Sequence, residues 1–137
     1  MAETIRKVEY YYTTVADKPG EGARVLGALR DAGVNLLAFH AFPSAKKAQL
    51  DFVPENAAAF KAAAQQAQIK VTGPKTAFLA EGDDRVGVIY DILRRLGAAG
   101  VNVTAIDAVR AGAGRYGALF WVKPAEVGKA AAALGAA

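Results

Sequence analysis

The feature of this chain that most constrains its fold is an internal repeat. When the sequence is shifted by 67 positions, nine of the 22 residues from 17 to 38 are identical, and no gap is needed. Segments of ordinary composition would match at about two positions by chance. The 137 residues therefore contain two copies of one unit, and we expect domains at 1–73 and 74–137. The matching residues are Asp17, Gly20, Leu26, Leu29, Ala32, Gly33, Val34, Asn35 and Ala38.

Each copy has the same order of predicted elements. A strand rich in β-branched and aromatic residues comes first, followed by a polar loop and a helix with one apolar face. A glycine then ends the helix, two further strands follow, and an alanine-rich helix comes next. The first copy closes with a short strand at 69–72. The other predicted strands are 8–15, 34–42 and 47–53 in the first copy and 76–80, 101–109 and 116–122 in the second.

This order predicts an α+β protein built from two tandem ferredoxin-like βαββαβ modules. Each module is expected to have an antiparallel sheet with its helices on one face. The second module differs, because only three residues follow the helix that ends near Leu134. We therefore expect no encoded last strand there. The edge is either truncated or completed by a partner subunit, since an exposed edge invites strand pairing.

Composition and charge exclude several classes of protein. The chain is 53% hydrophobic and 22% charged, which is typical of a folded protein, and it has no cysteine for disulfides or thiolate chemistry. No apolar run reaches the roughly 20 residues that span a bilayer, and charges occupy the N-terminus where a signal peptide would be apolar. We expect a cytoplasmic protein. The net charge of +4 is scattered along the chain, which indicates solvated surface.

The sequence offers no convincing catalytic or metal site. His40 is the single histidine, and the repeat places Asp107 at the equivalent position. A catalytic triad or a metal centre needs partners, and an unrepeated histidine supplies none. No nucleophile elbow, phosphate-binding loop or pair of acids on a shared face is present. We therefore expect neither an enzyme nor a bound cofactor or metal.

Two repeated segments resemble the ACT family of small regulatory modules. They are Asp17-Lys18-Pro19-Gly20 with Ala32-Gly33-Val34-Asn35, and Asp84 to Gly87 with Gly100-Val101-Asn102. The resemblance covers nearly the whole chain as two tandem modules. It implies amino-acid binding where the loop of one module meets the second strand of its neighbour. Val86 stands where the family often has proline.

The physical chemistry of these residues also favours a ligand site. A loop that enters a helix presents unpaired N–H groups and partial positive charge, which suit a carboxylate. Glycine allows close approach to the backbone, and asparagine offers both a donor and an acceptor. In the alternative interpretation, the aspartates cap helices, the glycines serve turns and the asparagines bond locally. The predicted ligand-binding residues are Asp17, Lys18, Pro19, Gly20, Asn35, Leu36, Asp84, Arg85, Gly87, Asn102 and Val103.

The residue pattern of the predicted strands also indicates that the sheet packs against another module or subunit. Residues 36–42 are largely apolar at both alternating sets of positions, whereas a sheet with one wet face should alternate apolar and polar residues. Helices cover one face, so we expect the other to pack against another module or a second subunit, giving a homodimer.

RNA-recognition modules share the same element order, and residues 115–122 faintly resemble their signature strand. The acid at position 51 and the misplaced aromatics argue against nucleic-acid binding.

The function that these patterns favour is regulation. We expect a protein that binds a small molecule, an amino acid above all, and shifts the activity of a separate enzyme or regulator. A structural module that assembles subunits without a ligand is the alternative. RNA binding through an RRM-like topology is a third and weaker hypothesis.

Overall fold

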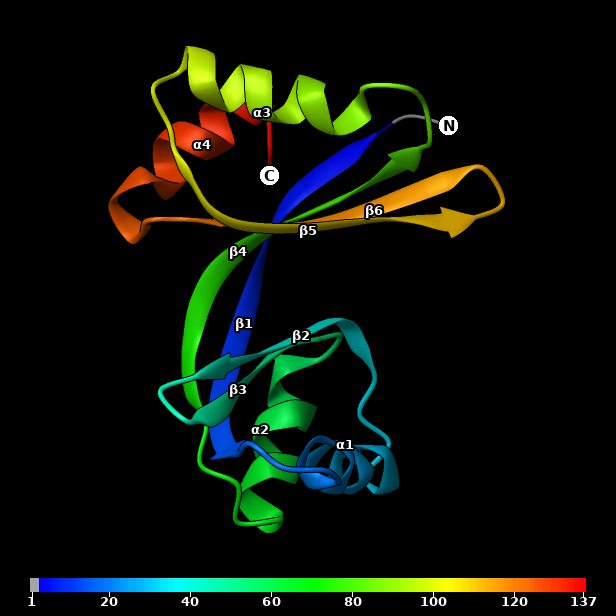
Figure 1. Ribbon diagram of the computed structural model, residues 1–137, viewed down its shortest axis with the longest axis vertical. Coiled ribbons are helices and arrows are strands. Elements are labelled where there is room, and N and C mark those ends of the chain that lie inside the picture. Colours follow the sequence, from blue (N-terminus) through cyan, green and yellow to red (C-terminus); the bar gives the residue numbers. More distant parts are fainter. Residues whose placement is uncertain (1–2) are drawn as a thin grey trace. The chain divides into compact units, whose positions relative to one another are not determined.

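The computed structural model describes residues 3–137 and has an α+β architecture (Figure 1). These residues form six strands, four α-helices and one short 3₁₀ turn, η1. No helix among them is long or apolar enough to cross a membrane. In chain order the elements are β1 (Thr4–Ala16), α1 (Glu21–Asp31), β2 (Leu36–Ser44), β3 (Lys47–Pro54), α2 (Ala57–Gln66), β4 (Thr72–Asp83), α3 (Val88–Ala98), β5 (Val103–Gly112), β6 (Arg115–Val122), η1 (Pro124–Glu126) and α4 (Val127–Leu134).

The chain divides into two compact units. The first unit comprises Glu9–Lys75, and the second comprises Thr76–Ala137 together with the start of the chain up to Val8. Strands β1 and β4 therefore each contribute residues to both units. The division into modules at 1–73 and 74–137 stays a prediction, and it differs from the compact units mainly in where the first eight residues belong.

Each unit contains a split βαβ arrangement. The strand order is β2-β3-β1-β4-β6-β5. In the first unit β3 pairs antiparallel with both β1 and β2, so β1 and β2 run parallel and α1 connects them. In the second unit β6 pairs antiparallel with both β4 and β5, and α3 makes the equivalent connection. This is the topology expected from the order of elements in the repeat.

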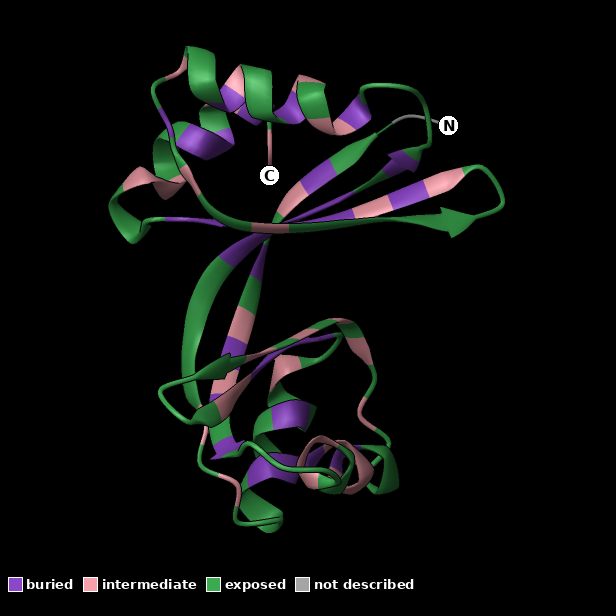
Figure 2. Ribbon diagram, in the orientation of Figure 1, coloured by how far each residue is buried: buried purple, intermediate pink, exposed green. Residues whose placement is uncertain are grey.

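The core of the first unit lies between its strands and its two helices. Phe60 of α2 is at its centre, with its ring 5.1 Å from the ring of Tyr11 and 5.3 Å from that of Phe52. The helices are amphipathic, and their buried residues lie three or four positions apart (Figure 2). The buried cluster comprises Tyr11, Val15, Val25, Leu29, Leu50, Phe52, Phe60 and Ala63.

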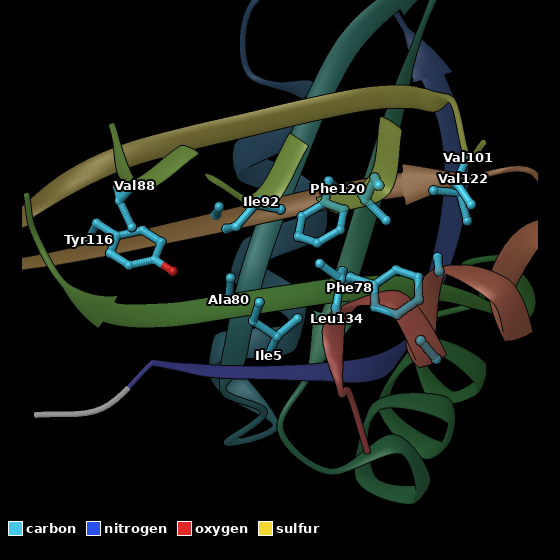
Figure 3. Close-up of a cluster of buried hydrophobic side chains, with 14 residues drawn as sticks. Ile5, Phe78, Ala80, Val88, Ile92, Val101, Tyr116, Phe120, Val122 and Leu134 are labelled. Carbon is cyan, nitrogen blue, oxygen red and sulfur yellow. The ribbon is translucent and has the colours of Figure 1, made fainter. Parts of the chain in front are cut away.

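The core of the second unit has the same plan (Figure 3). Phe78 of β4 and Phe120 of β6 are cross-strand partners with stacked rings, 5.4 Å between centroids, and both are fully buried. Helices α3 and α4 cover them, with Ile92 of α3 and Leu134 of α4 in the same cluster. Ile5 also joins this cluster, although it belongs to the first strand of the chain.

The start of the chain completes the second unit. The backbone N–H of Lys7 donates to the carbonyl of Ala137 at 3.2 Å. The carboxylate of Glu3 accepts from the Tyr116 hydroxyl at 2.7 Å and from Arg95 at 2.9 Å. Burial, the hydrogen bond to Glu3 and the charge of Glu3 together raise the pKa of Tyr116 above its ordinary value. The sequence analysis expected a truncated edge or a partner subunit here, and the structure corrects both expectations, because the chain's own first residues fill the place.

Two local expectations are confirmed and two are corrected. Gly33 and Gly100 follow their helices at φ 75° and 74°, the left-handed conformation expected for residues that end helices. The strands predicted at 69–72 and 76–80 are not separate, because β4 runs without interruption from Thr72 to Asp83. Pro54 ends β3, and α2 begins after its cap residue Asn56, whose side chain accepts from the N–H of Ala59 at 3.0 Å.

Candidate functional site

The predicted loop of the first unit opens α1 without a side-chain cap. Gly20 is the N-cap residue at φ 92°, a conformation that glycine adopts without strain, and no side chain caps the helix. Asp17 therefore does not serve as the helix cap. A Cβ placed at Gly20 would meet no atom within 4 Å. The turn thus requires glycine for its backbone conformation, and the space beside its Cα is open, while the first N–H group of α1, that of Glu21, donates to the carbonyl of Lys18 at 3.4 Å.

The equivalent loop of the second unit is tied down by its own charges. Gly87 has φ 82° and also begins its helix without a side-chain cap. Arg85 bonds to Asp91 in the first turn of α3, which lowers the pKa of Asp91. The carboxylate of Asp84 lies 3.6 Å from the guanidinium group of Arg110. The backbone N–H of Asp84 donates to the carbonyl of Gly114 at 2.8 Å. The charged groups of this loop already have partners within the unit.

The two asparagines lie just before β2 and β5, and both are exposed. The backbone carbonyl of Asn35 accepts from the N–H of Glu55 at 3.0 Å, and its side-chain amide donates to the Glu55 carboxylate at 3.4 Å. Leu36 and Val103, the other strand residues of the predicted site, are partly buried and pack against their own cores. In each unit the asparagine is therefore exposed, whereas the strand residue that follows it packs against the core.

Within the first unit, the loop and the asparagine lie at opposite ends of the sheet. Lys47 of β3 pairs with Ala16 and with Ser44, so the loop after β1 lies beside the end of β2. Leu36, at the start of β2, pairs with Pro54 at the other end of β3. The 11-residue helix α1, about 16 Å long, spans the distance between them.

The second unit has the same arrangement. Arg115 of β6 pairs with Asp83 and Gly112, while Val103 pairs with Val122 at the far end. Neither unit by itself therefore brings a helix-opening glycine to face an asparagine. The assignment of these residues to one ligand site stays a prediction.

An open hollow lies beside Asn35 in the first unit. Its volume is about 450 Å³. Its lining combines aliphatic and polar groups from the C-terminal half of α1, the turn after it and the start of β2, and its polar side chains belong to Arg30 and Asn35. The lining residues are Leu26, Leu29, Arg30, Gly33, Val34, Asn35 and Leu36.

The sequence analysis predicted only two of these lining residues, Asn35 and Leu36. It assigned Leu26 and Leu29 to the apolar face of a helix and did not single out Arg30. The sequence distinguishes the two copies at this position, where the first has Arg30 and the second has Gly97.

The other candidates from the sequence are the single histidine and the aromatic residues of the segment 115–122. Among residues 3–137 no group of three histidine, cysteine or acidic side chains is placed to hold a metal ion. The His40 ring packs 5.1 Å from that of Phe42. Tyr116 and Phe120 are buried in the core of the second unit, so these aromatics of the RRM-like strand are not exposed for base stacking.

Asp51 is a buried acid in the first unit, with 4% of its surface exposed. Gln49 donates to its carboxylate at 2.9 Å. Burial raises the pKa of Asp51 above its ordinary value of 3.8, and the hydrogen bond from Gln49 and the charges of His40 and Lys75 partly oppose this shift. The folded state therefore favours the protonated carboxyl group.

This shift predicts a pH dependence of stability. Because the folded pKa lies above the unfolded one, the contribution of Asp51 is fully present below the unfolded pKa of about 3.9 and is lost as pH rises through the folded pKa. Asp51→Asn stays neutral, so we expect its advantage over the wild type to grow as pH rises from about 3.5 to 7. Urea unfolding midpoints measured across this range test the prediction. Parallel profiles for the two proteins would contradict it.

Comparisons with known proteins support the fold. No family model matches the chain, and no curated protein matches it. Among solved structures, protein BT0572 from Bacteroides thetaiotaomicron is similar with a TM-score of 0.79 at 17% identity, covering 97% of this chain and 88% of that one. The ligand-free regulatory subunit of aspartate kinase from Thermus thermophilus has a TM-score of 0.65 at 14% identity, covering 98% and 96%.

The regulatory subunit of aspartate kinase from Thermus flavus is also similar, with a TM-score of 0.59 at 17% identity, covering 98% of this chain and 94% of that one. At such low identities the likeness concerns the fold alone. The α+β architecture of this chain is the ACT-like fold that regulatory subunits of aspartate kinase also have.

Proposed function

We propose that this chain is a regulatory protein that senses an amino acid and acts on a separate enzyme or regulator. The observation that carries the proposal is the hollow beside Asn35, whose lining residues are aliphatic except for Arg30, Asn35 and Gly33. The repeat and the ACT-like fold support the same role, because the similar solved structures include regulatory subunits of an enzyme of amino-acid metabolism. The proposed role is therefore regulatory and not catalytic.

Ligand binding would act through differential affinity. A ligand that binds one conformation or one assembly state more tightly shifts the population toward it. Coupling of this kind between two sites is typically worth about 1–3 kcal/mol, or 5- to 150-fold in affinity. The glycine loops, Asp17–Gly20 and Asp84–Gly87, are then proposed to complete a site with the second strand of another module, as in the family that the repeats resemble.

An assembly module without a ligand is the second candidate, and one observation favours it. Tyr90 and Leu93 are exposed large apolar residues three positions apart on α3, and Val86, just before the N-cap of this helix, is also exposed. Exposed apolar residues that gather into a patch mark a contact surface more often than singly exposed ones do. This alternative expects a stable homodimer that responds to no amino acid.

A thermal-shift screen against the twenty amino acids tests the proposed function. A ligand present at 100 times its dissociation constant adds about 2.7 kcal/mol to the free energy of unfolding, which raises the melting temperature by several degrees. We expect one amino acid, or a small related group, to give such a shift. The absence of any shift would refute the sensor proposal and favour the assembly module. Salt-sensitive retention of RNA oligonucleotides would favour RNA binding instead.

A further inference from the structure

The two copies differ in charge at equivalent positions around the asparagine. In the first unit the first residue of β2 pairs with the last residue of β3, Pro54, and in the second unit the first residue of β5 pairs with the last residue of β6, Val122. The residues that follow, Glu55 and Lys123, are therefore equivalent. The repeat also aligns Arg30 with Gly97, at an offset of 67 positions.

The hollow of the first unit thus has one charged residue in its lining, Arg30, and one of opposite sign, Glu55, beside the lining residue Asn35. The Glu55 carboxylate bonds to the Asn35 amide. A guanidinium group binds a carboxylate with strong charge-assisted hydrogen bonds, and a carboxylate accepts equally well from an ammonium group. Leu26 and Leu36 also line the hollow. An α-amino acid with an aliphatic side chain carries the matching set of groups.

We propose that this hollow is the chain's amino-acid site and that it takes one aliphatic α-amino acid. Glu55 and the carbonyl end of α1 bind the ligand's ammonium group, because the C-terminus of a helix carries partial negative charge. Arg30 binds the ligand's carboxylate, which that same helix end would otherwise repel. Leu26, Val34 and Leu36 contact the side chain. The inference rests on the proposed sensor function and adds the ligand class and the location.

Arg30 is free to change partners on binding. Its guanidinium group lies 2.9 Å from the carboxylate of the neighbouring Asp31, but both side chains are strongly exposed, at 81% and 70%. Ion pairs between exposed side chains contribute little to stability, so a ligand carboxylate that also contacts the hollow can replace Asp31. The ligand needs no rearrangement of the core to bind.

The second unit lacks the equivalents of both charged residues, Arg30 and Glu55. Gly97 offers no donor for a carboxylate, and Lys123 puts a positive charge where an ammonium group would need an acceptor. Asn102 alone is kept. The second unit therefore does not bind an amino acid at the equivalent place, and the chain binds one ligand and not two.

Isothermal titration calorimetry with L-leucine, L-isoleucine and L-valine tests the inference. Isoamylamine and 4-methylpentanoate, which are leucine without its carboxylate and without its ammonium group, serve as matched probes. We expect one ligand per chain, at least tenfold weaker binding by Arg30→Gln and Glu55→Gln, and at least tenfold weaker binding of each probe. Lys123→Gln is the matched control in the second unit, and it should bind as tightly as the wild type.

The outcomes separate this inference from the proposed function. If no amino acid binds the wild type, both fail. If a charged or aromatic amino acid binds instead, or if Arg30→Gln and Glu55→Gln bind as tightly as the wild type, the sensor function stands and this site is wrong. Two ligands per chain would refute the proposed difference between the units. Circular dichroism melts of the variants, whose altered side chains are at the surface, confirm that each is folded.

Discussion

Ile5→Asp is expected to lower the free energy of unfolding by about 4 kcal/mol. Ile5 is 8% exposed and packs in the core of the second unit, where Figure 3 shows it beside Ala80. The substitution removes the aliphatic contacts and places a carboxylate against apolar side chains. A large loss would confirm that the first strand of the chain is part of the core of the second unit.

Trp121 provides the readout for this variant. It is the single tryptophan of the chain and belongs to β6 of the second unit, so its fluorescence reports on the unfolding of that unit. Thr4→Asp is the matched control, because Thr4 is the neighbouring residue and is exposed; we expect it to change stability by less than about 0.5 kcal/mol. Equal midpoints for Ile5→Asp and the wild type would show that the first strand does not support this unit.

Phe60→Ala is expected to cost about 3–5 kcal/mol in the first unit. Phe60 is 1% exposed, and its ring lies against the rings of Tyr11 and Phe52. Alanine would leave a cavity at the point where α2 meets the sheet. Urea unfolding followed by circular dichroism measures the loss.

Two controls make the Phe60 result specific. Phe60→Leu keeps most of the volume and should cost less than about 1.5 kcal/mol. Lys61→Ala changes the neighbouring exposed residue and should be close to neutral. If Phe60→Ala costs no more than Lys61→Ala, the assignment of this ring to the core is wrong.

The repeat predicted the local structure well, because a helix or strand depends on residues near one another. The apolar spacing of Leu26 and Leu29 identified α1, and the glycine at 33 marked its end. The junction between the two modules was harder to predict. Gly73-Pro74 suggested the boundary between modules, and the compact units divide two residues later, between Lys75 and Thr76, within strand β4.

Pairing between distant residues could not be predicted from local pattern. The contact of Glu3 with Tyr116 joins residues 113 positions apart, and no local signal indicates it. The strand predicted at 8–15 is also longer in the structure, where β1 has 13 residues and begins at Thr4. This length allows β1 to contribute residues to both compact units.

The assignment of the predicted residues to one ligand site stays a prediction. The split βαβ topology already places the end of the first strand and the start of the second at opposite ends of a module, so the loop and the asparagine could not meet within one copy. Asn35 and Leu36 do line a hollow. The charged residues beside it, Arg30 and Glu55, were missed because the search followed what the copies share.

Nuclear magnetic resonance most directly tests the claim that an amino acid binds beside Asn35. In ¹H–¹⁵N correlation spectra titrated with L-leucine, L-isoleucine or L-valine, we expect the largest saturable shifts at the backbone amides of residues 33–36. The equivalent residues 100–103 should shift little. Spectra that stay unchanged at millimolar concentrations of all three amino acids, or whose shifts avoid residues 33–36, would contradict the account.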